Sequence, residues 1–536
     1  MTIKETIEEA KKVGVKDMSW KAWFMIVTII SAAAVASFYG VNVTMNIDLA
    51  NRVDTLEGML SHTINSTFYT LQKEPSCTIS IVTSGATTYY CVQNGTTGVL
   101  DSYSTTFLTV WNYVMTTGLG VTGGEVLIKA CASNYIVTGP LTDGGRSNVV
   151  VYIQQGATLW LNNNVDDCMF NITCVSNWTF TGGGTLDGNN LGQTDYAGSD
   201  SSISHGINIF NYANYMGTNY LIENLYITNF TRFGIQTFGN AATSTTNNVV
   251  IRGCTVKNCH WNLINIAKYS QNVRVSDNDC SYAGDVGIAI AAPGTNCRYI
   301  IIDSNIVHDI TLDPVYGATS NDWYGIGYEG SGARQIIITN NIVYNVQRGI
   351  FVTPTTTDGH VVIDGNTVTN ITRPAGQTYE TFCIGVKAPD AIISNNMIYI
   401  DSAAYNYFGI MIGADGVGNE AHRVLCIGNH INGVASANGT VIENSNDVIF
   451  SDNILYVTGW GVKLKDTVDR CMVIGNRFIS CSKGIDIDDA TDDMTFLDSN
   501  SFYGCTDALE DNSGPDTVFG SNMNATGSLD TNGSTL

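Results

Sequence analysis

An asparagine that recurs at intervals of 22 to 36 residues constrains the fold of this 536-residue chain more than any other feature. Each such asparagine stands three residues after an apolar residue or a cysteine, in the strings VSDN, IDSN, ITNN, IDGN, ISNN, CIGN, FSDN, VIGN, LDSN and FGSN. The ten positions are Asn278, Asn305, Asn341, Asn366, Asn396, Asn429, Asn453, Asn476, Asn500 and Asn522. A period near 24 residues, lengthened in places by insertions, is typical of a solenoid whose turns, or rungs, share one core.

A second short pattern, Gly-Ile/Val-x-apolar, recurs between the asparagines. It begins at Gly287, Gly325, Gly349, Gly409, Gly461 and Gly484. Two or three short alternating β segments per rung do not fit leucine-rich or helical repeats. The sequence therefore predicts an all-β fold, a right-handed parallel β-helix. In such a coil a buried turn asparagine can bond to the asparagine of the next rung and to the backbone, which satisfies groups that are costly to bury unpaired.

The charge balance excludes some partners. The formal net charge is −23, and only 19 of the 25 basic residues lie beyond Arg52. Nucleic acid binding requires a basic surface, so we expect no nucleic acid partner. A polyanionic substrate such as polygalacturonate is also disfavoured unless a small local basic patch outweighs the mean field.

Fourteen cysteines without a CxxC motif are unusual for a cytosolic protein. Three pairs could form disulfides, Cys77 with Cys91, Cys168 with Cys174, and Cys481 with Cys505. The last pair shares one register on neighbouring rungs, where strands lie about 4.8 Å apart. The alternative is a stack of buried free thiols, and the sequence leaves both open.

Ten Asn-x-Ser/Thr sequons support an extracellular location, because such sequons accept N-linked glycans in secreted proteins. They are Asn42, Asn65, Asn94, Asn171, Asn177, Asn229, Asn370, Asn438, Asn524 and Asn532. In a chain rich in Asn and Thr some sequons arise by chance.

The N-terminus predicts a membrane anchor. Residues 1–21 form a charged tail with five lysines, and residues 22–41 contain no charge and could span a bilayer. The lysines favour a cytoplasmic tail with the body outside, on a cell or virion surface. The alternative is a signal peptide cleaved near Ala36, which would leave a secreted protein.

Residues 42–75 predict a helical stalk. Apolar residues at 3-, 4- and 7-residue spacings between Asp48 and Leu71 could form a parallel stalk between copies, which would make the protein a homo-oligomer. The same segment could instead pack against the β body. Residues 76–122 then form an N-terminal cap region, and residues 123–536 form the parallel β-helix domain.

Three stretches carry a family resemblance. GGEVLIKACASNYIVTGPL from Gly123, NVVVYIQQGATLWL from Asn148 and WTFTGGGTLDGNN from Trp178 resemble the opening rungs of the pectin-lyase-like superfamily, most closely the polygalacturonase family of glycoside hydrolases. The resemblance extends over residues 123–300 and implies a functional groove along one sheet, bounded by long turn loops. The loop candidates here are residues 189–205, 308–323, 371–381 and 403–424.

The catalytic motifs of that family are degraded in this chain. The family pattern has NTDGIDI on one rung, GDDCVAI on the next, then GHG and RIK. This chain has HWNLINI and GDVGIAI, so Asn262 and Val286 replace two acids and only Asp285 remains. The next rung has no histidine, and Arg348 is the nearest counterpart of the RIK arginine. An inverting hydrolase needs two carboxyl groups, so the family mechanism is disfavoured.

Polar residues nevertheless follow one outward row beside the Gly-Ile strands. Asp285, Asp322 and Glu329 are the candidate catalytic acids, because coupling between neighbouring carboxylates can raise one pKa and create an acid–base pair. A lyase could instead use Lys268 or Arg348. The candidate substrate-binding residues are His205, Asn208, Gln236, Asn262, Asn265, Lys268, Tyr324 and Arg348. Outward residues of any β-helix must be hydrophilic, so this row alone does not establish a site.

The sequence predicts no cofactor and no transition-metal site, since it lacks HExxH and other ligand motifs. Acidic residues crowd the last rungs and could bind Ca²⁺, although a solvated acidic face is the simpler interpretation. They are Asp486, Asp488, Asp489, Asp492, Asp493, Glu510 and Asp511.

These features together predict a membrane-anchored extracellular β-helix that binds polysaccharide or glycan as a recognition or structural module of the surface. The alternative is a carbohydrate-active enzyme, a hydrolase or lyase with a non-standard acid–base set.

Overall fold

The fold was analysed in a computed structural model of the chain. The structure describes residues 75–194, 204–291, 296–310, 323–330, 333–354, 360–372, 381–401, 407–413, 421–434, 437–488, 495–511, 517–524 and 527–528. The expected tail (1–21), membrane segment (22–41) and nearly all of the stalk (42–75) lie outside these residues. Within the described ranges, no helix has the length and apolar character needed to cross a membrane.

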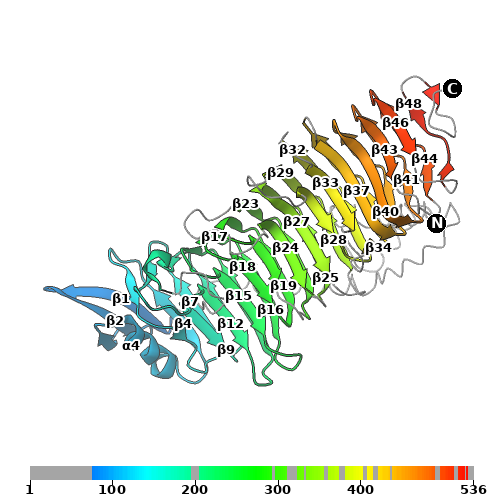
Figure 1. Cartoon of the computed structure of the whole chain (residues 1–536). Helices are drawn as coiled ribbons and strands as arrows, with labels where there is room; N and C mark the ends of the chain where they lie inside the picture. The colour runs from blue at the N-terminus through cyan, green and yellow to red at the C-terminus, as the bar shows by residue number, and fades with distance from the viewer. Residues whose placement is uncertain are drawn as a thin grey trace, which may run out of the picture. The chain divides into compact units, whose positions relative to one another are not determined.

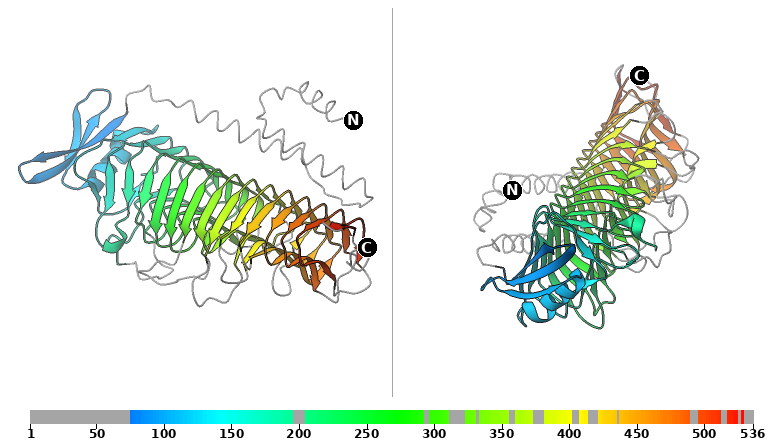
Figure 2. Two further views of the ribbon diagram at one scale, coloured as in Figure 1. Left: turned by 90° about the horizontal axis from the view of Figure 1, so that it is seen from above. Right: turned by 90° about the vertical axis from the view of Figure 1, so that its left-hand side faces the viewer.

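The described chain winds into a coil of three long sheets, which we call A, B and C (Figures 1 and 2). One rung shows the order: β19 (Ser270–Ser276) lies in sheet A, β20 (Asp279–Ala283) in sheet B and β21 (Ile288–Ala291) in sheet C. Each strand pairs in parallel with the equivalent strand of the next rung, as Ile264 of β18 (Ile264–Ala267) pairs with Ile288. The predicted Gly-Ile strands are those of sheet C.

The core fills the inside of the coil. Alternate strand residues point inward, so a strand such as β7 (Val149–Ile153) is buried at its first, third and fifth positions. The inward positions of sheet C are almost all Ile, Val or Leu and are completely buried, as at Ile288, Ile326 and Ile350. The inward apolar side chains of each rung therefore stack on those of the next, and together they form one continuous apolar core along the coil.

The asparagine ladder occupies the corner between sheets A and B, and the predicted bonding is confirmed. Asn341 Nδ2 donates to Asn366 Oδ1 over 3.0 Å and to the carbonyl of Ile302 over 3.0 Å. Its own Oδ1 accepts from the backbone N and the Nδ2 of Asn305, at 2.9 and 3.0 Å. The same bonds repeat from Asn278 to Asn522, so each buried amide is satisfied by its neighbours.

The residue before each ladder asparagine from Asn278 to Asn500 has a left-handed backbone. Its φ lies between 53° and 69°, for example at Asp277, Asn340, Asn395 and Gly428. Asn, Asp, Ser and Gly fill this position because they adopt the left-handed conformation at the least cost, and the turn between the sheets requires it.

The segment before the coil folds onto its first rung. Strands β1 (Cys77–Ser84), β2 (Thr87–Asn94) and β3 (Leu100–Ser104) form an antiparallel unit, and β1 also pairs in parallel with β4 (Gly124–Ile128) of sheet A. The short helix α4 (Phe107–Tyr113) continues into η1 (Val114–Gly118). The Trp111 indole of α4 is buried and donates to the Thr142 carbonyl over 2.8 Å, which fixes the helix against the coil.

All fourteen cysteines are free thiols, so the three candidate disulfides are absent from the structure. Cys77 lies opposite Asn94 in the β1–β2 hairpin and Cys91 lies opposite Ser80, an offset too large for a disulfide. Cys481 and Cys505 are hydrogen-bonded as thiols on neighbouring rungs. Most of the other cysteines are buried core residues, and burial raises the pKa of thiols such as Cys254 and Cys259 to about 12.

The ladder generates a stability prediction. Replacing Asn341 with alanine removes partners from the Asn305 amide, the Asn366 side chain and the Ile302 carbonyl, all of them buried. We expect a loss of about 3 kcal/mol or more in the free energy of unfolding, measured from urea denaturation. The outward-facing Asn432 of sheet B is the control, and Asn432→Ala should change stability by less than about 0.5 kcal/mol. Equal effects at both positions would contradict the ladder's role.

Thiol reactivity provides a second test. A hydrogen bond from the Cys481 thiol lowers the pKa of Cys505, whereas burial raises the pKa of Cys91. Because the thiolate is the reactive form, iodoacetamide labelling of Cys505 should accelerate at lower pH than labelling of Cys91, which is also half-buried. Cys481→Ala, which removes the donor, should slow labelling at Cys505 near neutral pH. Mass spectrometry of the labelled peptides measures both rates, and equal rates at the two cysteines would refute the expectation.

Candidate functional site

The candidate site is the outer face of sheet C. Each strand of sheet C has one outward residue that lies in register with its counterparts on the neighbouring rungs. Together these residues form one continuous row, here called the central row. It runs through Asn171, Asn208, Gln236, Asn265, Ala289, Gly327, Phe351, Gly385, Met411 and Val441. The strands that carry it are β9 (Phe170–Thr173), β12 (Ile207–Asn211), β15 (Ile235–Gly239), β18, β21, β24 (Tyr324–Gly330), β27 (Arg348–Pro354), β30 (Thr381–Val386), β33 (Tyr407–Gly413) and β37 (Ala437–Asn446).

The predicted binding residues do share this outer face, but they differ in accessibility. His205, Asn262, Asn265 and Tyr324 are buried, with exposed fractions between 1% and 4%. Asn208, Gln236, Lys268 and Arg348 are half-buried.

Of the candidate acids, only Asp285 has a described side chain, and it is half-buried. Asp322 lies outside the described residues. For Glu329 the structure describes the strand register, opposite Ala291 and Thr353, and not the side chain. The described residues therefore define no pair of candidate carboxylates.

The middle of the face is a second apolar cluster. It comprises Val286, Ala289, Tyr324, Phe351, Phe382, Phe408, Met411 and Val441, all buried. Arg348 is held against this cluster, since its guanidinium lies 5.3 to 5.7 Å from the ring centroids of Tyr324, Phe351 and Phe382. It also donates to the Tyr324 hydroxyl over 2.7 Å. Arg348 thus has a structural position among aromatic rings.

The far end of the face carries ion pairs. Lys483 Nζ lies 2.7 Å from Glu510 and 3.1 Å from Asp486, and Lys463 Nζ lies 2.6 Å from Asp488. The Lys463 ammonium lowers the pKa of Asp488. Lysines therefore neutralise part of the predicted acidic patch, while Asp489, Asp492 and Asp493 lie outside the described residues. No group of three or more potential metal ligands gathers within the described ranges.

The beginning of the face is different, because half-buried amides and aromatic rings lie together there. Asn208 Nδ2 donates to Asn171 Oδ1 over 3.0 Å, and Gln236 follows on the next rung. Phe210 and Phe238 are outward neighbours in register, with ring centroids 5.0 Å apart. We call this the amide–aromatic patch; it comprises Asn171, Asn208, Gln236, Phe210, Phe238, Tyr212 and Lys268.

Two members complete the patch. The ring of Tyr212 lies 5.4 Å from that of Phe210, and Tyr212 is 43% exposed. Lys268 Nζ lies 5.4 Å from the ring centroid of Phe238, so the cation covers one ring at the edge of the patch.

His205 borders this patch as a neutral side chain. Its ring stacks on Phe233 at 5.0 Å, and burial together with the nearby Arg232 lowers its pKa to about 3. Its Nδ1 is buried without a hydrogen-bond partner. A neutral imidazole of this kind can accept or donate one hydrogen bond, but it does not supply positive charge near neutral pH.

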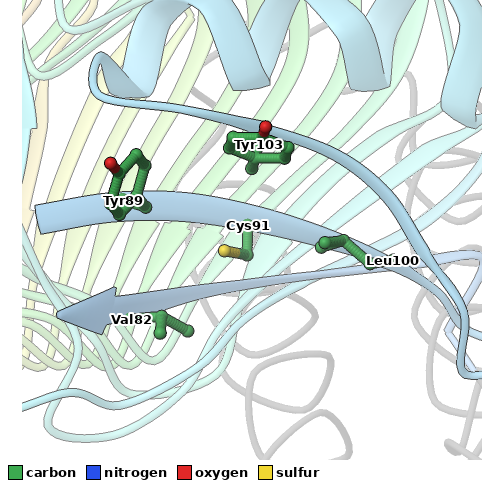
Figure 3. Close-up of a pocket in the computed structure, with 5 residues that line it drawn as sticks. All are labelled: Val82, Tyr89, Cys91, Leu100 and Tyr103. Carbon is green, nitrogen blue, oxygen red and sulfur yellow. The ribbon is translucent and has the colours of Figure 1, made fainter. Parts of the chain in front are cut away.

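Two surface hollows lie elsewhere. One is an apolar depression on the β1–β3 unit, where Val82, Tyr89, Cys91, Leu100 and Tyr103 gather (Figure 3). Its lining offers no charged group for chemistry.

The other hollow lies where the chain enters sheet A and is lined by Arg298, Tyr299, Arg334, Gln335 and His360. Its two arginines make it a small basic site in an otherwise acidic chain.

The sequons occupy varied positions. Asn177 is exposed, and Asn94, Asn171, Asn229 and Asn370 are half-buried. Asn438 is 5% exposed and accepts a hydrogen bond from the Trp460 backbone, which leaves no room for a glycan in the folded chain. Asn42, Asn65 and Asn532 lie outside the described residues, as does the side chain of Asn524.

Phe210, Phe238 and Tyr212 were not among the residues predicted from sequence. Phe210 and Phe238 stand two residues after the outward amides of Asn208 and Gln236, so the period-2 alternation of a strand could have identified them. Tyr212 follows its strand in a turn, and no sequence signal places it beside Phe210.

Comparisons with known proteins agree on the architecture. A family model described as "Right handed beta helix region" matches residues 199–368. A search of the curated proteins found no match.

Three solved structures illustrate the structural similarity. A mutant tailspike protein of E. coli bacteriophage HK620 in complex with a hexasaccharide is 14% identical, with 78% of this chain and 75% of that chain covered and a TM-score of 0.47. The adhesin PfbA of Streptococcus pneumoniae is 14% identical, with 78% and 88% covered and a TM-score of 0.41. A polygalacturonase from Erwinia carotovora is 13% identical, with 84% and 96% covered and a TM-score of 0.38. Similarity at these levels assigns no activity to this chain. The coil of sheets A, B and C, with the matched region inside it, is a right-handed parallel β-helix.

Proposed function

We propose that this protein is a surface module that binds glycans through the amide–aromatic patch of sheet C and does not hydrolyse them. The observation that carries the proposal is the composition of the patch. Asn171 and Gln236 offer amide groups, Asn208 orients Asn171 by donating to its Oδ1, and the rings of Phe210, Phe238 and Tyr212 stand beside them. Sugars present both hydroxyl groups and flat C–H faces, which amides and aromatic rings respectively contact.

The same composition favours binding over turnover. The outward residues of β9, β12, β15 and β18 include no carboxylate. Glycoside hydrolysis in most families requires two carboxyl groups that flank one glycosidic bond. The lone cation, Lys268, has no acidic partner in the patch and is suited to a sugar hydroxyl or to one acidic substituent.

The cellular setting is part of the proposal and is supported by sequence alone. The uncharged segment 22–41, the lysines before it and the sequons after it favour an anchored protein with its β-helix outside. Residues 42–75 would associate copies of the chain, and several weak glycan contacts would then add up through multivalency.

Binding can be tested by substitution within the patch. Gln236→Ala and Phe238→Ala should each weaken binding of a responsive glycan by about tenfold, measured by calorimetry after a glycan-array screen of the purified β-helix protein. Lys268→Ala should also weaken binding. Lys257→Ala is a matched control, because Lys257 lies 4.8 Å over the Tyr226 ring in the same arrangement on sheet B. Unchanged affinity in all three patch variants would contradict the proposal.

Turnover provides the test against the enzymatic alternative. We expect no reducing ends and no unsaturated products when the protein is incubated with a panel of neutral and acidic polysaccharides. The control is Asp285→Asn, which removes the one candidate acid with a described side chain. Product formation by the natural chain that disappears in Asp285→Asn would establish an enzyme in place of a binding module.

A further inference from the structure

On the outer face of sheet B, bands of apolar and polar residues alternate from rung to rung between residues 342 and 456, and the next two rungs are mixed. Each strand presents two outward residues, and register aligns them in two parallel rows. One row reads Tyr344, Thr369, Tyr399, Asn432, Tyr456, Ile479 and Tyr503. The other reads Ile342, Thr367, Met397, His430, Ile454, Arg477 and Ser501.

The strands that carry these rows are β26 (Ile342–Val346), β29 (Thr367–Ile371), β32 (Met397–Ile400), β36 (His430–Gly433), β39 (Ile454–Tyr456), β42 (Arg477–Ile479) and β45 (Ser501–Tyr503).

Tyrosine therefore occupies every second rung of its row, and on three of those rungs the other outward residue is Ile or Met. Thr, Asn and His fill the rungs between them on β29 and β36. Neighbouring parallel strands lie about 4.8 Å apart, so successive tyrosines are separated by about 9.6 Å along the coil. We call this surface the tyrosine face. Its two-rung period is a property of the outward residues only, because the inward residues are apolar on every rung.

Five large hydrophobic side chains of the tyrosine face are exposed, whereas Tyr344 and Tyr399 are half-buried. Ile342, Met397 and Ile454 are 39% to 43% exposed, and Tyr456 and Tyr503 are 47% and 43% exposed. Large apolar side chains that are exposed together on one face mark an interaction surface more often than scattered ones do. By contrast, the apolar cluster on the outer face of sheet C is buried.

The ends of the tyrosine row are held in place by neighbours. The His308 ring stacks on Tyr344 at 4.8 Å with an interplanar angle of 5°, and its two ring nitrogens face Asp309 and Asp279 at 2.7 and 3.0 Å. At the other end the Arg477 guanidinium lies 4.7 Å from the Tyr503 ring. Each of these neighbours covers one face of its ring, so Tyr399 and Tyr456, between the two ends, are the rings of the row on which a ligand would stack.

The charge of the face limits the partner. The chain has a net charge of −23, yet the outward residues of these seven strands include no carboxylate. Their formal positive charge comes from Arg477 and, when protonated, His430. An uncharged ligand meets no repulsion here, whereas a polyanion would be repelled by the chain as a whole. The carboxylates that touch the face already have partners, Asp401 with the Thr369 hydroxyl over 3.1 Å and Asp309 and Asp279 with His308.

We propose that the tyrosine face binds an extended, neutral, equatorially linked polysaccharide that lies along the coil axis. The chemical repeat of such a chain is two sugar rings, a length close to the two-rung separation of the tyrosines. One ring of each repeat would stack on a tyrosine and its aliphatic neighbour. On the rungs between, Asn432 would meet hydroxyl groups of the other ring, and the Thr369 hydroxyl, which donates to Asp401, would accept from them. This site is separate from the amide–aromatic patch, and neither proposal depends on the other.

The first experiment measures binding of the full chain to cello-, chito- and manno-oligosaccharides of increasing length, with amylose as a helical control. Affinity should rise with length for at least one of the three extended series and remain undetectable for amylose. Tyr399→Ala and Tyr456→Ala should each lower that affinity by about five- to tenfold, and the double variant by more. Tyr103→Ala is the matched control, since Tyr103 is 64% exposed on the β1–β3 unit.

A second variant tests the spacing and not only the hydrophobicity. Exchanging residues between neighbouring rungs, Thr369→Tyr with Tyr399→Thr, keeps the composition of the face and destroys the two-rung period. The exchange should lower affinity about as much as Tyr399→Ala does. Unchanged affinity after the exchange would overturn the periodic match, and unchanged affinity in Tyr399→Ala and Tyr456→Ala would overturn the site.

Two further readouts separate this proposal from its rivals. If Tyr456→Ala changes the oligomeric state measured by light scattering, the face is an interface between copies and the proposal is wrong. If Gln236→Ala and Phe238→Ala abolish all glycan binding while the tyrosine variants do not, the amide–aromatic patch alone binds glycans and this inference fails. Loss of oligosaccharide binding in the tyrosine variants would support the inference, whether or not the variants of the amide–aromatic patch bind glycans.

Discussion

The stack of buried asparagine amides at the corner between sheets A and B is the interaction on which the rest of the structure depends. Each amide is buried, so each of its bonding groups must find a partner inside the protein. The partners are the backbone and the amide of the next rung, as at Asn341, Asn366 and Asn396. A shift of one residue in any rung would break two such bonds and reverse the faces of its strands. The ladder therefore fixes the register of the coil from Asn278 to Asn522.

The ladder also restricts where the chain can vary. Each corner from β16 (Thr246–Arg252) and β17 (Thr255–Cys259) to β44 (Phe496–Asp498) and β45 joins sheet A to sheet B through two residues, a left-handed residue and the ladder position. An insertion there would separate neighbouring amides. Insertions consequently fall between sheets B and C and between sheets C and A, for instance at 311–322 and 414–420. Variation in loop length is thus confined to the two sides of sheet C, and the corner beside sheet B stays uniform.

Sequence predicted the repeated part of this molecule well, because the ladder and the Gly-Ile strands depend on interactions that recur at one spacing. It identified Asn208, Gln236 and Lys268 as outward residues of sheet C for the same reason. It did not predict that Asn262, Asn265 and Tyr324 on the same face are buried. Alternation within a strand shows whether a side chain points outward or inward, but it does not show whether an outward side chain is exposed to solvent. It also did not decide whether the cysteines are free thiols or form disulfides. A shared register of Cys481 and Cys505 is equally compatible with two thiols and with a disulfide.

The outward residues of sheets B and C differ in how far they are buried, and the loops beside each sheet explain the difference. Sheet C has long connections on both sides, and its outward residues include a second apolar cluster and an arginine held among aromatic rings. Sheet B lacks insertions on its ladder side, and its outward Ile, Met and Tyr side chains remain in contact with solvent at a cost in hydrophobic free energy. Solubility alone would favour polar residues at those positions. The fold does not require apolar and polar bands to alternate every second rung between residues 342 and 456 of this surface. A ligand with the same repeat explains that alternation more readily than packing does.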